Sequence, residues 1–395
     1  MASISLINKV KHSSLLYSAY YYIGSLFVNT LKLLLRPDNK LILFVSYGGK
    51  KYDDSPKDIY ESMINDIRFE GFKKVWAFLN PEKYDIGAGK KIKIDTLEYY
   101  RTALKARVWI TNVGVTRALS FRGLHTLAVN SWHGTPIKYI GNDAKKETTF
   151  SSKGSGEPID VMLAQGDYEV ERFAQAFRLL PKSIVKTGLP RNDILVRENT
   201  PDRIMQLKKK LGIPFDKKVI LYAPTYRDYE MENRSDCVMS PPLDLEKWRS
   251  LFGKEYVFLL RAHFVVMKVL NVKENDFVKD FSIYPTLSDL LLITDMLITD
   301  YSSILFDYSI LGRPIFCYVY DYEKYKSKRG MYFDIRKELT YTENEEELID
   351  RIKNINWNSE KEIVSKFREK YVQEYGNASK KIIDIIYNNI NKMKN

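Results

Sequence analysis

Residues 296–319 constrain the fold more than any other stretch of the chain. An apolar, β-branched run at 296–299 stops at Asp300, and a polar loop and a helical apolar pattern over 304–311 follow. A Gly-Arg-Pro triplet ends this helix, and the apolar run 315–319 is typical of a second buried strand. Two buried strands joined by a helix form a βαβ unit, so the sequence predicts a parallel sheet.

The polar residues of this unit follow its first strand directly. Ligands of open parallel sheets bind beyond the carboxyl ends of the strands, where Asp300, Ser302 and Ser303 lie in the predicted unit. The two serine hydroxyls and the first amides of the helix favour a phosphate group. The same Asp-x-Ser-Ser pattern is also an ordinary N-cap, so a phosphate site and a structural cap both remain open.

Length and charge bound the function. A chain of 395 residues is long enough for two domains with full cores, and its 45% hydrophobic and 28% charged residues are typical of a globular protein. The formal net charge of +12 indicates an anionic partner. Without zinc-ligand spacing or an Arg-rich recognition pattern, a phosphorylated small molecule or an acidic membrane is favoured over nucleic acid. Cys237 and Cys317 follow no secretory signal and predict no disulfide framework, which suits the cytoplasm.

The N-terminal stretch 13–31 contains no charged residue and is flanked by Lys9, Lys11, Lys32 and Arg36. Its length approaches that of a membrane span, but serine, tyrosine, glycine and asparagine reduce its apolar character. We therefore expect a helix that lies in the membrane interface with its basic ends on anionic lipid. A helix packed on the first domain with its tyrosines inward remains open.

Alternating strands and helices predict two doubly wound α/β domains. Strands of the first domain are expected at 41–46, 75–78, 108–111, 126–129, 161–164 and 184–187, and strands of the second at 218–223, 256–261, 296–299 and 315–319. The expected divisions are an amphipathic, membrane-associated helical segment at 1–38, an N-terminal domain at 39–195, a C-terminal domain at 196–375 and a closing helix at 376–395.

Two of the four histidines follow predicted strands, which makes them the most informative residues of the chain. Next to His133, Gly134 permits a close approach and Pro136 is suited to open a helix, so the imidazole is positioned as a general base. Arg261 and His263 are two residues apart, so in an extended chain both point to one side and bind one phosphate. A core histidine bonded to backbone, for His133, and a surface ion pair, for Arg261, remain open.

Thr225 and Arg227 also follow a predicted strand directly. Both residues are able to donate hydrogen bonds to a phosphate or a nucleotide. A simple turn in which Asp228 pairs with Arg227 is the open alternative. We expect no metal site, since neither a carboxylate cluster nor His-rich spacing is present.

Five ordered segments together resemble the CDP-glycerol glycerophosphotransferase family of teichoic acid synthesis, the TagB/TagF-type enzymes. Five motifs in the same order are highly specific, whereas residues 1–125 carry no motif that matches. The segments are WHGTPIKYIG at 132–141, APTYRD at 223–228, RAH at 261–263, ITDYSSILFDYSILGRP at 298–314 and RGMYFD at 329–334.

The resemblance implies an α/β fold of the GT-B-like class, with two facing Rossmann-like domains and a cleft between them. It implies peripheral attachment to the cytoplasmic side of the cell membrane. We expect no cofactor. His133 is the expected base, and His263 the expected diphosphate ligand. The expected substrate-binding residues are Trp132, Gly134, Thr135, Thr225, Arg227, Arg261, Thr299, Asp300, Ser302, Ser303, Arg329 and Asp334.

The expected reaction moves glycerol phosphate from CDP-glycerol to a hydroxyl of an undecaprenyl-diphosphate-linked disaccharide, with release of CMP. The chain length favours the priming step, in which one unit is added. A poly(glycerol phosphate) or ribitol phosphate polymerase, a GT-B nucleotide-sugar glycosyltransferase and a non-catalytic membrane scaffold remain open. The oligomeric state is not predicted.

Overall fold

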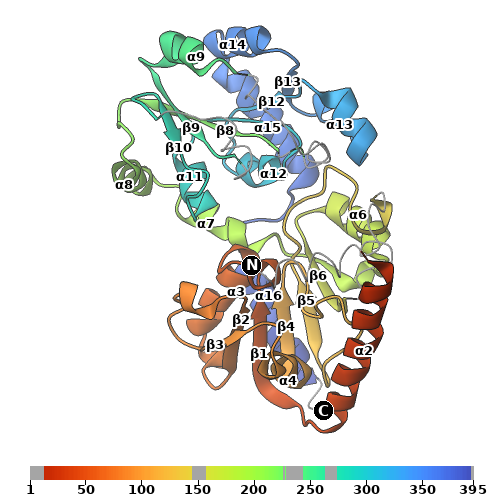
Figure 1. Cartoon of the computed structure of the whole chain (residues 1–395). Coiled ribbons are helices and arrows are strands. Elements are labelled where there is room, and N and C mark those ends of the chain that lie inside the picture. The colour runs from red at the N-terminus through yellow and green to blue at the C-terminus, as the bar shows by residue number, and fades with distance from the viewer. Residues whose placement is uncertain (1–12, 145–156, 226, 228–242, 263–273, 393–395) are drawn as a thin grey trace. The chain divides into compact units, whose positions relative to one another are not determined.

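The computed structural model describes residues 13–144, 157–225, 227, 243–262 and 274–392 (Figure 1). The chain forms two compact units, each built on its own sheet. Unit 1 comprises Met1–His133, Ile140–Asp193 and Asn377–Asn395, and unit 2 comprises Gly134–Tyr139 and Ile194–Gly376. His263, Asp228 and Cys237, which the sequence analysis singled out, lie outside the described residues.

Unit 1 contains a parallel sheet of seven strands in the order β3-β2-β1-β4-β5-β6-β7. All six predicted strands are present. The seventh, β3, was missed because it is an edge strand in which only Ile92 is buried, so it lacks an apolar run. The strands are β1 (Asp38–Val45), β2 (Lys73–Phe78), β3 (Lys90–Lys93), β4 (Ala106–Thr111), β5 (Leu127–Asn130), β6 (Val161–Ala164) and β7 (Ile184–Lys186).

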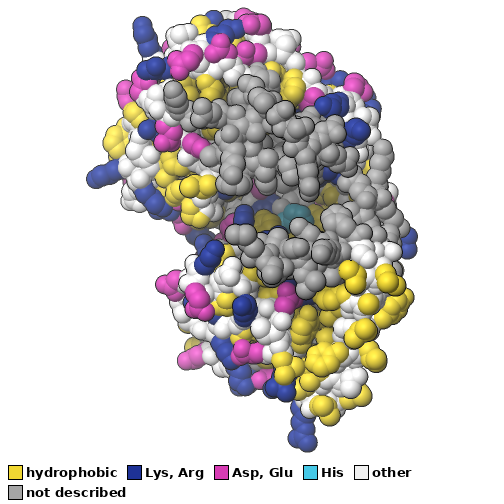
Figure 2. Space-filling view, in the orientation of Figure 1, with side chains coloured by type: hydrophobic (Ala, Val, Ile, Leu, Met, Phe, Trp, Pro, Cys, Tyr) yellow, Lys and Arg dark blue, Asp and Glu magenta, His cyan; other side chains and the backbone are white. Residues whose placement is uncertain are grey.

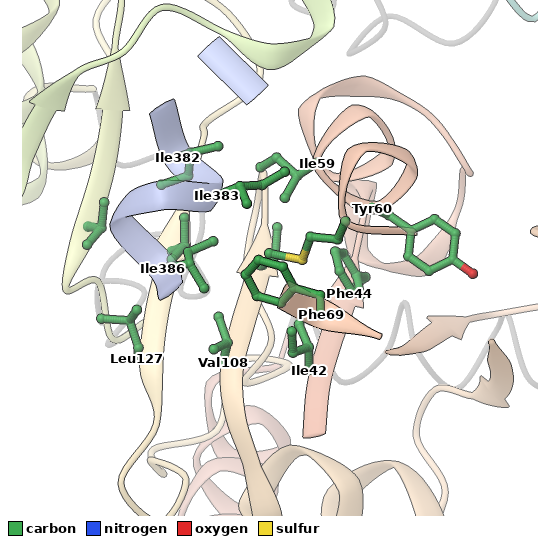
Figure 3. Packing of buried hydrophobic residues seen from close by; sticks show 14 of the residues in the cluster. Ile42, Phe44, Ile59, Tyr60, Phe69, Val108, Leu127, Ile382, Ile383 and Ile386 are labelled. Carbon is green, nitrogen blue, oxygen red and sulfur yellow. The ribbon is translucent and has the colours of Figure 1, made fainter. Parts of the chain in front are cut away.

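Helices from both ends of the chain cover the sheet of unit 1. The last helix, α16, places Ile382, Ile383 and Ile386 beside Ile59 of α3 and against strand residues such as Val108 (Figure 3). Its isoleucines recur every three or four residues, so one apolar face returns the C-terminal segment to the first sheet. The helices of unit 1 are α2 (Ser14–Leu33), α3 (Asp54–Ile64), α4 (Leu97–Lys105), α6 (Asp167–Phe177) and α16 (Ala378–Lys392).

Unit 2 contains a parallel sheet of six strands in the order β10-β9-β8-β11-β12-β13. The four predicted strands are its centre, and the two missed strands are three-residue edges. The strands are β8 (Lys218–Ala223), β9 (Tyr256–Leu260), β10 (Val278–Asp280), β11 (Met296–Thr299), β12 (Ile315–Tyr318) and β13 (Thr340–Thr342). The helices are α7 (Asp193–Arg197), which begins at the end of unit 1, α8 (Pro201–Leu211), α9 (Leu245–Phe252), α11 (Leu287–Ile293), α12 (Ile304–Ser309), α13 (Tyr322–Arg329), α14 (Glu345–Lys353) and α15 (Trp357–Tyr371).

The N-terminal helix α2 has one packed face and one exposed apolar face. Tyr17 and Val28 are buried, and the Tyr20 hydroxyl donates to the Arg117 carbonyl at 2.8 Å, so α2 packs on the first domain. The tyrosines do not all point inward, since Tyr20 and Tyr22 are exposed. The opposite face carries large apolar side chains that are at least half exposed, and Figure 2 shows hydrophobic side chains gathered over α2. They include Leu15, Tyr22, Ile23, Leu26, Phe27 and Leu33. Among the described helices, none combines the length and apolar character needed to cross a membrane.

One local prediction near His133 is wrong. Pro136 opens no helix, because residues 134–139 run as irregular backbone beside residues 330–332. Lys138 forms an antiparallel bridge with Met331, and the Tyr332 amide donates to the Ile137 carbonyl at 2.8 Å. Pairing with a segment almost two hundred residues away overrides the local preference of proline for a first helical turn.

Candidate active site

His133 lies at the carboxyl end of β5 in unit 1 and is half-buried. Its Nδ1 lies 3.1 Å from the Asn112 backbone oxygen, and its ring centroid lies 4.2 Å from that of Trp132. A carbonyl oxygen only accepts, so Nδ1 donates and, in the neutral ring, the lone pair belongs to Nε2. The backbone hydrogen bond proposed as the structural alternative is therefore present, and it leaves the ring in the tautomer that a base at Nε2 requires.

Two further residues of unit 1 occupy equivalent positions at neighbouring strands. Asn112 follows β4, which is next to the strand that precedes His133, and Tyr47 follows β1, which is the next strand beyond β4. The Tyr47 amide donates to Asn112 Oδ1 at 2.8 Å. Neither residue was predicted, although Asn112, a polar residue directly after an apolar strand, carried a signal that could have found it.

Asp300 lies at the carboxyl end of β11 in unit 2 and is buried. Its Oδ1 accepts hydrogen bonds from the backbone amides of Thr225 at 2.8 Å and Tyr301 at 2.6 Å. Its Oδ2 lies 2.9 Å from Arg227 Nη2. The carboxylate thus joins the loops that follow β8 and β11, and its contact with substrate stays a prediction.

Arg227 is also buried, with 1% of its side chain exposed. Its Nε and Nη2 donate to the two oxygens of Asp321 at 2.7 and 2.9 Å, and the Tyr301 and Tyr325 rings lie 5.0 and 5.1 Å from its guanidinium carbon. Burial alone would lower the pKa of Arg227, but the two carboxylates raise it. Arg227 is therefore a buried cation held by two protein carboxylates, and its donation to phosphate stays a prediction. Asp321, 94 residues away, carried no sequence signal.

The two threonines of this sheet edge differ in what their hydroxyls do. Thr299 Oγ1 donates to the Ala223 carbonyl at 2.6 Å and so joins β11 to β8, while its contact with substrate stays a prediction. Thr225 Oγ1 is buried and has no hydrogen-bond partner within the described part of the chain. Since buried hydroxyls are normally paired, Thr225 stays the stronger candidate for a ligand contact.

Gly134 brings two distant motifs together in unit 2. A Cβ atom at Gly134 would lie 2.3 Å from Ser303 Oγ and 2.7 Å from Ser303 Cβ, so only glycine permits this approach. Ser302 Oγ accepts from the Ile304 amide at 3.4 Å, whereas the Ser303 side chain makes no capping hydrogen bond. The cap alternative therefore describes Ser302, and Ser303 remains a candidate phosphate contact beside Gly134. Thr135 is buried.

Asp334, after β12 and α13, acts locally. Its Oδ1 accepts from the Arg336 amide at 3.1 Å, and the Arg336 guanidinium donates to both its oxygens. Burial would raise the pKa of Asp334, but these hydrogen bonds hold it below its ordinary value. Asp334 therefore caps the turn that follows it, and its predicted contact with the donor stays a prediction. Arg329, at the last position of α13, is half-buried.

Arg261 follows β9 and is half-buried. Its Nη1 donates to the carbonyls of Phe281 at 3.1 Å and Tyr284 at 2.8 Å, so backbone oxygens hold part of the guanidinium. Because His263 lies outside the described residues, the binding of one phosphate by Arg261 and His263 together stays a prediction. Within those residues, no group of three or more His, Cys, Asp or Glu side chains is arranged to hold a metal ion.

Comparison with known proteins identifies the family. The model of the CDP-Glycerol:Poly(glycerophosphate) glycerophosphotransferase family matches residues 27–388. The teichoic acid poly(glycerol phosphate) polymerase of Staphylococcus epidermidis is 35% identical over 89% of this chain, which spans 51% of that relative's length. The teichoic acid glycerol-phosphate transferase of Staphylococcus aureus is 34% identical over 91% of this chain and 96% of its own. A poly(glycerol phosphate) polymerase of Bacillus spizizenii is 32% identical over 95% and 98%.

Solved structures agree with this assignment. A variant of the wall teichoic acid polymerase TagF soaked with CDPG superposes with a TM-score of 0.83 at 32% identity, covering 93% of each chain. A UDP-GlcNAc 2-epimerase from Neisseria meningitidis, at 12% identity and a TM-score of 0.53 over 88% of this chain and 99% of its own, shares the fold alone. The predicted GT-B-like class, with two Rossmann-like domains, is confirmed. The chain belongs to the CDP-glycerol glycerophosphotransferase family of teichoic acid synthesis.

Proposed function

We propose that this protein transfers glycerol phosphate from CDP-glycerol to a hydroxyl of a polyprenyl-diphosphate-linked acceptor, and that it acts at the cytoplasmic face of the membrane. The single observation that carries the proposal is the convergence of motif segments in unit 2. Gly134 packs on Ser303, and Thr225 and Arg227 both bond to Asp300. Residues far apart in sequence therefore lie together beyond the carboxyl ends of the strands, where open parallel sheets bind ligands.

The proposed reaction is an in-line displacement at phosphorus. The acceptor oxygen bonds to the phosphorus that carries glycerol, the bond from that phosphorus to the CMP oxygen breaks, and His133 takes the hydroxyl proton. Ser303, Thr225 and the cationic side chains of the RAH segment meet the charge of the diphosphate and of departing CMP. Positioning and electrostatics dominate such a transfer.

The number of units added separates two candidate functions. The sequence favoured a priming enzyme because the chain is short, but a polymerase of Bacillus spizizenii aligns over 98% of its own length with this chain. Chain length therefore does not discriminate between the two. The polymerases of Staphylococcus epidermidis and Bacillus spizizenii among the relatives favour repeated addition as the second candidate.

Mass spectrometry of the product tests both candidates. The protein is incubated with a short synthetic lipid-linked disaccharide and with CDP-glycerol, CDP-ribitol or a UDP-sugar, and the mass increments report the donor and the number of additions. We expect glycerol phosphate increments and CMP release. A sugar increment, or no increment from either CDP-alditol, would overturn the proposal, and a ladder of increments would select repeated addition over priming.

We predict that Thr225→Val weakens CDP-glycerol binding about 10-fold or more without destabilising the fold. A hydrogen bond to a charged group contributes about 1.5–3 kcal/mol to the free energy of binding. Folding should be unaffected, because the buried Thr225 hydroxyl makes no hydrogen bond within the described part of the chain. Calorimetric titration and chemical denaturation measure the two effects. Thr225→Ser, which keeps the hydroxyl, is the matched control. Wild-type affinity in the valine variant would remove Thr225 from the donor site.

We also propose that the exposed face of α2 docks on an anionic membrane surface. Ile23→Glu with Phe27→Glu should release the protein from anionic liposomes and reduce activity on membrane-held acceptor, while activity on a short water-soluble acceptor is kept. The packed face of α2 is untouched, so folding should be preserved. Lys32 and Arg36 would each contribute on the order of 1 kcal/mol to the free energy of binding to anionic lipid. Because this attraction is electrostatic, binding should weaken as the salt concentration rises.

A matched control for the α2 variant uses apolar residues exposed elsewhere on unit 1. Ile67 and Leu180 are 83% and 61% exposed, and replacing both with glutamate adds the same charge. This control should stay bound to liposomes. Retained binding of the α2 variant, or equal loss of activity on both acceptors, would contradict membrane docking through this face.

A further inference from the structure

The carboxylate of Asp54 in unit 1 is buried and fully hydrogen-bonded. Its Oδ2 accepts from the Tyr47 hydroxyl at 2.8 Å and from Asn112 Nδ2 at 2.9 Å. Its Oδ1 accepts from the Ser55 amide at 2.6 Å and from Arg191 Nη1 at 3.1 Å. Burial would raise the pKa of Asp54, but Arg191 and these donors hold it below its ordinary value. The Asp54 carboxylate is therefore a buried anion that accepts four hydrogen bonds.

The backbone around this carboxylate is strained. Asp54 has φ +64° and Tyr47, which donates to it, has φ +47°. L-residues rarely adopt this region, and such conformations persist where the surrounding contacts over-determine them, often at functional sites. These two strained residues are joined by one hydrogen bond and lie at the carboxyl ends of the strands, where His133 also lies. Their strain indicates a functional role for this part of the sheet.

Asn112 connects the buried anion to His133. Its side-chain amide is held at both ends, since Nδ2 donates to Asp54 and Oδ1 accepts from the Tyr47 amide at 2.8 Å. Its backbone oxygen accepts from His133 Nδ1 at 3.1 Å. The position of this carbonyl is therefore set by Asp54 and Tyr47, and the carbonyl in turn decides which ring nitrogen of His133 carries the proton.

We propose that Asp54 is a positioning residue for the reaction, acting through Asn112 on the tautomer and orientation of His133. The inference rests on the proposed function of His133 as the base. With Nδ1–H held on the Asn112 carbonyl, the lone pair of Nε2 receives the proton of the acceptor hydroxyl. Without the anchor, Asn112 is free to move and the imidazole loses its fixed tautomer. Asp54 itself contacts no reacting atom in this scheme.

The first test measures the tautomer directly by ¹⁵N NMR of the full chain with labelled histidine. The chain has only four histidines, and a His133→Gln variant assigns the signal of interest. We expect the Nδ1–H tautomer for His133 in the wild type and a shift toward Nε2–H in Asp54→Asn. Asn112→Ala, which removes the same link from the other side, should give the same shift and serves if Asp54→Asn does not fold.

Asp160→Asn is the matched control. Asp160 is paired with Arg122 and accepts a hydrogen bond from the Ala128 amide at 2.8 Å. It directly precedes β6 and so lies at the amino-terminal ends of the strands, away from His133. Its replacement should leave the His133 signal unchanged. A wild-type tautomer in both Asp54→Asn and Asn112→Ala would overturn the proposal, whatever their activity.

The second test is a kinetic cycle that also separates this inference from the proposed function. Asp54→Asn should lower kcat on the order of 10²-fold, as expected for a misplaced reacting group, while KM for CDP-glycerol is kept. In a His133→Ala background the same change should have no further effect. An equal loss in both backgrounds would show a merely structural role. Full activity of His133→Ala alone would instead remove the base from the proposed function, and the NMR result would still decide the positioning.

Discussion

Replacing His133 with alanine should lower kcat by about 10²- to 10⁴-fold while CDP-glycerol binding stays near that of the wild type. The size of the loss is that of a general base, and binding is spared because the base acts on the acceptor hydroxyl and not on the nucleotide. Single-turnover kinetics with saturating donor measure the chemical step, and calorimetric titration measures donor affinity. The half-buried ring and its Nδ1 contact with the Asn112 carbonyl support this expectation.

The chain offers a matched control for this variant. His125 lies two residues before β5, at the opposite end of the strand that leads to His133, and its side chain is exposed. His125→Ala should leave both kcat and donor affinity unchanged. Activity of His133→Ala within a few-fold of the wild type would remove His133 from the mechanism and require another base.

Replacing Arg227 with alanine should reduce the free energy of unfolding of unit 2 by about 3–5 kcal/mol. The change leaves the buried carboxylate of Asp300 and the partly buried carboxylate of Asp321 without their shared cation, and breaking a buried ion pair from one side costs about this much. Donor binding should fall as well, because Asp300 also holds the Thr225 loop. Chemical denaturation followed by far-UV circular dichroism measures the loss.

An exposed arginine in the same unit provides the comparison. Arg249 pairs with Asp276 at 2.7 Å, but its side chain is 43% exposed, so Arg249→Ala should change the free energy of unfolding by less than about 1 kcal/mol. If Arg227→Ala keeps wild-type stability and loses only donor affinity, Arg227 is a direct ligand of phosphate, as its motif suggested, and the positioning role is wrong.

The central strands of both sheets could be predicted because each is an apolar run that is buried on both faces. The edge strands could not. In β3 only Ile92 is buried, and β10 and β13 have three residues each, so none carries a hydrophobic pattern that differs from a loop. Their membership in the sheets depends on the neighbouring strand that supplies hydrogen bonds, which local sequence does not specify.

The positions of the candidate site residues were accessible in the same way. His133, Thr225 and Asp300 each follow a strand that the sequence reveals, and parallel topology puts such residues at one edge of each sheet. Their chemical roles were less accessible. Arg227, Asp300 and Asp334 looked like ligand contacts, but each of them is held by protein groups in the folded chain.

The sequence by itself determined the α/β class, the family motifs and the strand ends that carry polar residues, because these depend on local patterns of apolar and polar side chains. The tertiary structure alone decided which polar groups are already satisfied. Asp321 lies 94 residues from Arg227, and Asn112 lies 58 residues from Asp54, yet both pairs are in hydrogen-bond contact. Whether a buried charge holds another element or is left for a ligand depends on partners that only folding brings within about 3 Å.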